Sequence, residues 1–89
     1  VKYVEVKDRK TIVMADGFSG THKNNLQEFA YLLPRDSFVR CHRSFIVNVH
    51  HIKEIFPDTH STFVLAMDDE MRIPVSQSYS SYFRKLLGF

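Results

Sequence analysis

Basic side chains gather at residues 40–43, which read Arg-Cys-His-Arg. Strand-like apolar sequence precedes this run at residues 38–39 and follows it at residues 45–49. Side chains alternate between the two faces of an extended backbone, so the run presents a cationic group on each face where the strand leaves the core. A guanidinium group can fork onto a guanine edge or clamp a phosphate. The run therefore predicts an anion-binding strand end, although a solvated end with ordinary surface charge fits the spacing equally well.

Two further groups of polar residues suit nucleic-acid recognition. Arg9 and Lys10 belong to a polar turn at residues 7–10, which is either a solubilising turn or a contact for phosphates. Residues 76–78, Ser-Gln-Ser, lie where the last helix should begin. A Gln side chain can pair with adenine, and Ser hydroxyls at a helix start can bind phosphate together with free backbone N–H groups. The candidate contact residues are therefore Arg9, Lys10, Arg40, His42, Arg43, Ser76, Gln77 and Ser78.

The chain also holds possible metal ligands and nucleophiles, and their spacing argues against both uses. The possible ligands are Cys41, His42, His50, His51 and His60. Adjacent pairs of these residues point to opposite faces of a strand, whereas zinc requires ligands that converge at about 2 to 2.3 Å. For the same reason His42 cannot act as the base for a Cys41 thiolate, and Ser44 has no nucleophile-elbow context. We therefore expect no metal, no cofactor and no enzymatic activity.

The composition is that of one small globular domain. Hydrophobic residues make up 44% of the 89-residue chain and charged residues 25%, which argues against disorder. The formal charge of +2 is only mildly basic, so local clustering must carry any nucleic-acid interpretation. A single Cys and the lack of any apolar run near roughly 18 residues predict a cytoplasmic protein without a membrane span. Because the chain starts directly in strand-like sequence, we expect residues 1–89 to be an excised domain with a receiver or sensor module upstream.

Alternating and β-branched residues predict a β meander in the N-terminal third. Residues 1–6 and 11–15 read as a hairpin around the polar turn, and Gly-containing turns then lead into a short strand at residues 21–23. A helix should follow, because Asn24 and Asn25 can cap it and an apolar stripe has helical spacing. The stripe consists of Leu26, Phe29, Ala30 and Leu33, and Pro34 ends the helix.

The C-terminal half reads as further strands and a final helix. Strands are expected near residues 52–56, 61–67 and 71–75. The acidic turn at residues 68–70 should point away from any polyanion. Aromatic and Leu residues at helical spacing predict a helix within residues 76–89, capped by Ser76 or Ser78. The expected fold class is mainly β, with about seven short strands and two helices, the first of them between sheets.

The central run and its flanks resemble the LytTR family, the DNA-binding output domains of bacterial response regulators. Residues 38–48, Phe-Val-Arg-Cys-His-Arg-Ser-Phe-Ile-Val-Asn, match the family's Phe-x-Arg-x-His-Arg-Ser-aromatic-x-Val-Asn core. Stretches at residues 3–5, 25–29, 51–55 and 73–76 resemble the family's opening strand, first helix, next strand and last strand end. The resemblance implies an elongated, LytTR-like arrangement of three antiparallel sheets, with a short helix between sheets and a C-terminal helix.

The resemblance also implies a function. LytTR domains read the major groove of double-stranded DNA with loops rather than with a recognition helix, and the matching loops are residues 7–10, 40–44 and 76–78. The expected role is therefore that of a sequence-specific output domain of a two-component transcription regulator, bound as paired copies to direct repeats. Within the central segment, we expect Arg40 to meet a phosphate and Arg43 to reach a base edge.

Two positions depart from the family pattern. Cys41 stands where an aliphatic residue is common, so it is either a packing residue or a redox-responsive thiol whose pKa the neighbouring cations lower. Gln77 stands where many members have Arg. Because Gln suits adenine where Arg suits guanine, the target sequence cannot be transferred from relatives.

A β-rich protein-interaction module is the alternative function. Such a module would bind a partner chain through exposed strand edges and an aromatic surface. DNA binding should weaken steeply as salt rises, because phosphate neutralisation releases counterions, whereas an apolar interface should be nearly indifferent to salt.

Overall fold

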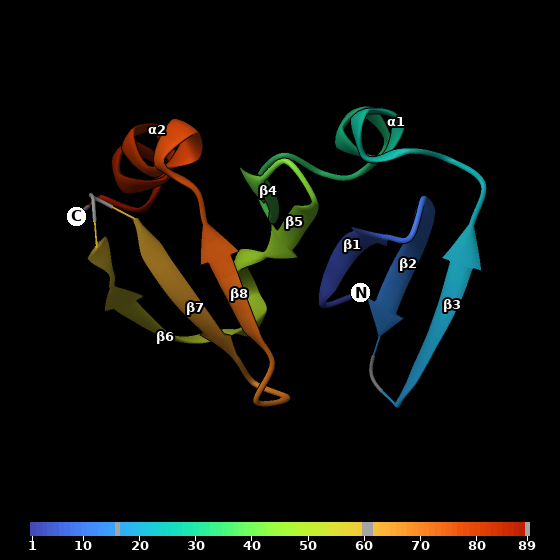
Figure 1. The fold of residues 1–89 in the computed structure, drawn as a ribbon, viewed down its shortest axis with the longest axis horizontal. Helices are drawn as coiled ribbons and strands as arrows, with labels where there is room; N and C mark the ends of the chain where they lie inside the picture. The colour runs from blue at the N-terminus through green and yellow to red at the C-terminus, as the bar shows by residue number, and fades with distance from the viewer. Residues whose placement is uncertain (16, 60–61, 89) are drawn as a thin grey trace.

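Within residues 1–15, 17–59 and 62–88, which the computed structural model describes, the chain forms eight strands and two α helices (Figure 1). The strands are β1 (Tyr3–Lys7), β2 (Lys10–Ala15), β3 (Phe18–His22), β4 (Phe38–His42), β5 (Phe45–Asn48), β6 (Ile52–Pro57), β7 (Phe63–Met67) and β8 (Arg72–Val75). The helices are α1 (Leu26–Leu32) and α2 (Gln77–Leu87), and a short 3-10 helix, η1 (Val49–His51), precedes β6. The expected mainly β fold with two helices is confirmed, although β3 starts earlier than residue 21.

The strands form two antiparallel sheets rather than the three that the family resemblance implied. One sheet has the strand order β3-β2-β1-β5-β4, and the other has the order β6-β7-β8. The number differs because β1 pairs on both of its edges: Tyr3 is opposite Met14 of β2 and opposite Val47 of β5. This pairing joins the N-terminal meander and the β4–β5 hairpin into one continuous sheet.

Helix α1 covers one face of the five-stranded sheet and does not lie between sheets as expected, because β3 and β4, which it connects, belong to the same sheet. A capping box starts the helix: the Glu28 N–H donates to Asn25 Oδ1 at 2.8 Å, and the Asn25 N–H donates to Glu28 Oε1 at 3.0 Å. Leu26 and Phe29 are buried against β1 and β5. Ala30, expected on the buried stripe, is instead exposed, and it lines a hollow beside β4.

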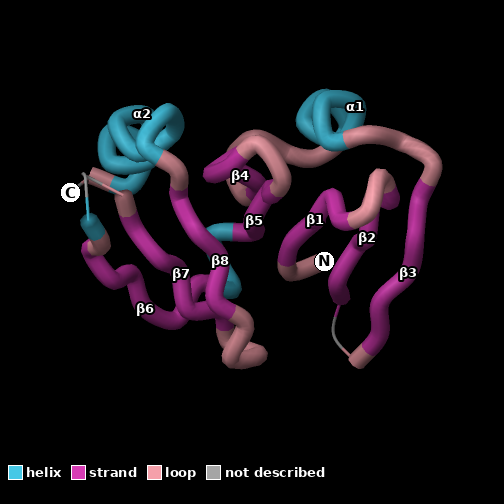
Figure 2. Tube along the Cα trace, viewed as in Figure 1, coloured by secondary structure: helices cyan, strands magenta, loops and turns pink. Residues whose placement is uncertain are grey.

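The main core lies between the two sheets and is closed by α2 (Figure 2). Strand β7 shows the expected alternation, since Phe63, Leu65 and Met67 are buried in this core. Phe83 of α2 is fully buried in the same cluster, and α2 packs against β4. Helix α2 therefore fixes the end of β8, which leads into it, relative to the central hairpin.

An ion-pair cluster also ties the sheets together at the β7–β8 turn. Asp68 Oδ1 lies 3.0 Å from Lys2 Nζ, and Asp68 Oδ2 lies 2.6 Å from His51 Nδ1. The Asp68 N–H also donates to the His51 backbone oxygen at 2.9 Å. Hydrogen bonds, first from His51 and then from Lys2, hold the pKa of Asp68 below its usual value. The acidic turn is thus partly neutralised within the domain.

Candidate nucleic-acid interface

The β4–β5 hairpin carries the central basic run, and a β-bulge at Cys41 shapes it. Arg40 pairs with Ile46 and His42 pairs with Phe45, so Cys41 is an extra residue in β4. The Cys41 side chain is fully buried in the core between the sheets. Burial raises the pKa of its thiol to about 12, so the neighbouring cations do not activate it. Cys41 is therefore a packing residue, and the redox interpretation is wrong in its premise of a lowered pKa.

Arg40 closes the turn that Arg43 occupies. The Arg40 Nη2 donates to the backbone oxygen of Arg43 at 2.7 Å, and the Arg40 Nε donates to that of His42 at 3.3 Å. Arg40 is half-buried, whereas Arg43 is exposed. The structure therefore gives Arg40 a positioning role within the hairpin and leaves Arg43 at the surface of the turn.

His42 is held as a neutral imidazole with one free donor. Its Nδ1 accepts a hydrogen bond from the Ser44 N–H at 3.1 Å, which places the ring proton on Nε2. The ring also meets Phe45 edge-on, at a centroid distance of 5.7 Å. Burial lowers the pKa of His42, and the neighbouring Arg43 and Arg40 lower it further. At neutral pH His42 is thus a hydrogen-bond donor without a charge, not a third cation in the run.

The lowered pKa of His42 predicts that mild acid destabilises the fold. The unfolded chain takes up a proton at His42 near its ordinary pKa of 6.5, while the folded domain resists protonation until a lower pH. This contribution to the free energy of unfolding is complete above the unfolded pKa and is lost as the pH falls through the folded pKa. His42→Asn should keep the Ser44 hydrogen bond through its Oδ1 and remove the titration. Urea unfolding of both proteins over this pH range measures the difference; identical pH dependence would contradict the prediction.

The β1–β2 turn brings Arg9 and Lys10 next to the central hairpin. The Val6 N–H, near the end of β1, donates to the Ser44 backbone oxygen at 2.9 Å. Asp8 and Arg9 have φ angles of 52° and 65°, the left-handed conformation of a two-residue hairpin turn that usually favours Gly or Asn. Arg9 and Lys10 are both exposed. A strained turn therefore carries two exposed cations close to the Arg43 turn.

The β8–α2 junction also meets the central hairpin. The Ser76 N–H donates to the Cys41 backbone oxygen at 3.0 Å. Ser76 is the N-cap residue of α2, although its side chain makes no capping hydrogen bond, and Ser78 lies within the first turn of the helix. Gln77 and Ser78 are exposed, and Ser76 is half-buried. All three segments of candidate residues are thus joined through the backbone of one hairpin.

These three segments lie along one side of the domain, as expected. In Figure 1 the β1–β2 turn, the β4–β5 turn and the β8–α2 junction are in the upper part of the view, on the side of the two helices. The β7–β8 turn, with its three adjacent acidic residues, points to the lower side. The carboxylates therefore face away from the candidate contacts, as the approach of a polyanion requires.

The fold adds residues to this side that the sequence pattern did not single out. A hollow of about 460 Å³ is lined by the candidate residues Arg9 and Lys10 and by Thr11, Thr21, His22, Lys23 and Asn25. The signal that could have found it is the pairing of β2 with β3, since Thr11 is opposite His22. That register places the end of β3 beside the β1–β2 turn.

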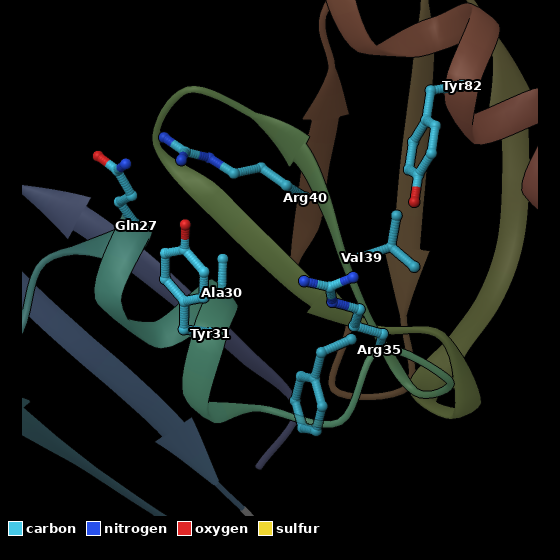
Figure 3. Close-up of a pocket in the computed structure, with 8 residues that line it drawn as sticks. Gln27, Ala30, Tyr31, Arg35, Val39, Arg40 and Tyr82 are labelled. Carbon is cyan, nitrogen blue, oxygen red and sulfur yellow. The ribbon is translucent and has the colours of Figure 1, made fainter.

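A second hollow, of about 350 Å³, lies beside Arg40 between α1, β4 and α2 (Figure 3). Gln27, Tyr31, Arg35 and Tyr82 contribute to its lining. In Figure 3 the Arg40 guanidinium points away from Arg35, toward the β4–β5 turn. Tyr31 and Tyr82 are 77% and 58% exposed. The hollow is therefore an open depression with aromatic sides rather than an enclosed ligand cavity.

Metal ligands and membrane spans can be considered only for the part of the chain that the structure describes. In those ranges no group of three or more His, Cys, Asp or Glu residues could hold a metal ion. His60, one of the possible ligands, lies outside the described residues. No helix of the described ranges has the length and apolar character that crossing a membrane requires.

The class that this fold and this polar side define is a mainly β DNA-binding domain. The chain belongs to the LytTR family, because the family model of the LytTr DNA-binding domain matches residues 1–88.

Relatives and a solved structure agree with this family. The chain is 38% identical over 88 residues to the transcriptional regulatory protein YpdB of Escherichia coli K12, covering 98% of this chain and 36% of YpdB. It is 40% identical over 85 residues to the sensory transduction protein LytT of Bacillus subtilis, covering 96% of this chain and 35% of LytT. A solved LytTr DNA-binding domain from Bacillus cereus is 72% identical, with a TM-score of 0.97 over 100% of this chain and 82% of that one. The chain thus spans about a third of the length of the curated relatives it matches.

Proposed function

We propose that this DNA-binding domain is the sequence-specific output domain of a bacterial transcription regulator and reads the major groove of double-stranded DNA with loops. The observation that supports this most is the joining of three polar segments by two backbone hydrogen bonds, from Val6 to Ser44 and from Ser76 to Cys41. Because these bonds hold the segments together on one side, a single duplex can meet all of them.

Each candidate residue has a role that its position suits. The exposed Arg43 guanidinium reaches a base edge, and Gln77 suits adenine. Arg40 positions the Arg43 turn through its two backbone hydrogen bonds, and His42 offers its Nε2–H to a phosphate or base acceptor. Phosphate contacts fall to Arg9, Lys10, Ser76 and Ser78.

The surrounding protein is part of the same proposal. YpdB and LytT are about three times as long as this chain, and their names describe regulation and sensory transduction. We propose that a receiver or sensor module precedes residues 1–89, that the whole regulator acts in the cytoplasm, and that two copies bind repeated half-sites. Pairing of copies on direct repeats would add contacts without enlarging the domain.

Selection of bound fragments from random duplex DNA tests the proposal. An enriched motif should appear, and binding to it should weaken steeply as salt rises, with a log–log slope of about −0.9 per phosphate contacted. Scrambled duplexes of the same length are the control for sequence preference. Recovery of no motif, together with equal affinity for all duplexes, would contradict sequence-specific reading.

A protein-interaction module is the second candidate. The exposed apolar side chains of α1 and α2 favour it, namely Tyr31, Leu32, Tyr82 and Leu86. Family membership favours DNA as the main partner. Binding that persists unchanged in high salt would instead point to an apolar partner surface.

A further inference from the structure

A row of three lysines crosses the strands at one end of the five-stranded sheet. Lys7 of β1 is opposite Lys10 of β2. Thr11 is opposite His22 at the end of the β2–β3 ladder, and the next residue outward on each side, Lys10 and Lys23, lines the same hollow. Like charges directly opposite each other destabilise a sheet. The arrangement therefore costs stability unless an anion lies across it.

No carboxylate of the described residues pairs with this lysine row. Among the described residues, the basic members of the ion pairs are Lys2, His51 and Lys53. The carboxylates nearest in the sequence to Lys7 and Lys23 are those of Asp8, in the turn, and Glu28, whose side chain accepts from the Asn25 N–H in the capping box. Lys7, Lys10 and Lys23 are all exposed.

His22 adds a ring N–H donor to the same hollow. Its Nδ1 accepts the Asn24 N–H at 3.2 Å, which leaves the proton on Nε2. Its ring meets Phe29 edge-on at a centroid distance of 5.1 Å. This is the arrangement that holds His42 in the central hairpin, where Ser44 and Phe45 take the places of Asn24 and Phe29. The domain thus carries two imidazoles locked in the same tautomer on one side.

We infer that the hollow lined by Lys10, Lys23 and His22, with Lys7 opposite Lys10, binds a backbone phosphate of DNA that flanks the bases read by the central hairpin. The inference rests on the proposed function and adds a contact to it. The longest axis of the domain extends 33 Å and is horizontal in Figure 1, where the β3–α1 connection lies at one end of the upper side. One turn of B-DNA spans about 34 Å. A duplex along this side therefore runs about one helical turn within the length of the domain. The chemistry that the hollow offers it is a phosphate oxygen held between ammonium groups.

Salt-dependent binding of Lys23→Ala tests the inference. Loss of one phosphate contact should reduce the magnitude of the log–log salt slope by about 0.9. If the variant and the wild type bind equally at 1 M salt, the variant should bind about fivefold more weakly than the wild type at 0.15 M. The loss should be the same on selected and scrambled duplexes. Lys53→Ala is the matched control, because Lys53 is an exposed lysine that pairs with Glu70 at 3.6 Å in the other sheet. Lys53→Ala should keep the wild-type slope. Lys23→Gln repeats the test with a longer neutral side chain.

The outcomes separate the failure of this inference from the failure of the proposed function. Wild-type binding with an unchanged slope in Lys23→Ala and Lys23→Gln overturns the phosphate site alone. A wild-type domain that binds no duplex overturns the proposed function and this site with it. In a second arm, nuclear magnetic resonance follows His22 and Lys23 during titration with inorganic phosphate. Saturable chemical-shift changes of His22 and Lys23 with phosphate, combined with unchanged duplex binding by the variants, would overturn the DNA assignment in favour of a site for a free anion.

Discussion

Arg43→Ala should lose about 1 to 3 kcal/mol of binding free energy on the selected DNA site and little on scrambled duplex. The reason is that Arg43 is exposed at the tip of a turn whose shape other groups hold, so its removal takes away the proposed base contact and leaves the scaffold intact. The selection should then relax at one base position. Fluorescence anisotropy with the selected and scrambled duplexes measures both effects. An Arg43→Ala domain that keeps its full preference would shift base reading to Lys10 or Gln77.

Arg40→Ala is the matched comparison for Arg43→Ala. Arg40 donates to the backbone oxygens of His42 and Arg43, so its loss should loosen the turn and weaken binding on all sequences alike. The salt slope distinguishes two contributions of Arg40. A direct phosphate contact would reduce the slope magnitude by about 0.9, whereas a purely positioning role would leave the slope unchanged. Circular dichroism must first show that the variant is folded.

Phe83→Ala should destabilise the domain by about 3 to 5 kcal/mol. Phe83 is fully buried in the core between the sheets, and its removal leaves a cavity where α2 meets that core. Native proteins have a free energy of unfolding of about 5 to 15 kcal/mol, so the loss is a large part of the whole stability. DNA binding should fall with it, because α2 begins at the Ser76–Gln77 junction.

Tyr82→Ala is the control for Phe83→Ala. Tyr82 is the preceding aromatic residue of α2 and is 58% exposed, so its loss should change the free energy of unfolding by no more than about 0.5 kcal/mol. Urea unfolding of the wild type and of both variants measures these values. A small loss in Phe83→Ala would mean that α2 does not stabilise the two sheets.

The sequence alone determined the local elements and the family. Alternation predicted β7, the Asn25 position predicted the start of α1, and the run at residues 38–48 identified the family that the comparisons confirm. These three predictions succeeded because each depends on residues close together in the chain. Over such short distances, the alternation of side chains and the capping hydrogen bonds determine the local structure directly.

The tertiary structure alone decided how those elements meet. The merging of β1 with β5 depends on the register between strands far apart in sequence. The burial of Cys41 depends on a bulge in the β4–β5 pairing, and the lysine row depends on the registers of the β1–β2 and β2–β3 pairings. The same holds for Asp68, which pairs with Lys2 across the two sheets. No local pattern specifies such pairings, because a shift of one residue in register moves every side chain to the other face while leaving the alternation of the strand unchanged. The sequence therefore predicted which residues are basic, and only the paired strands decided which of them share one side.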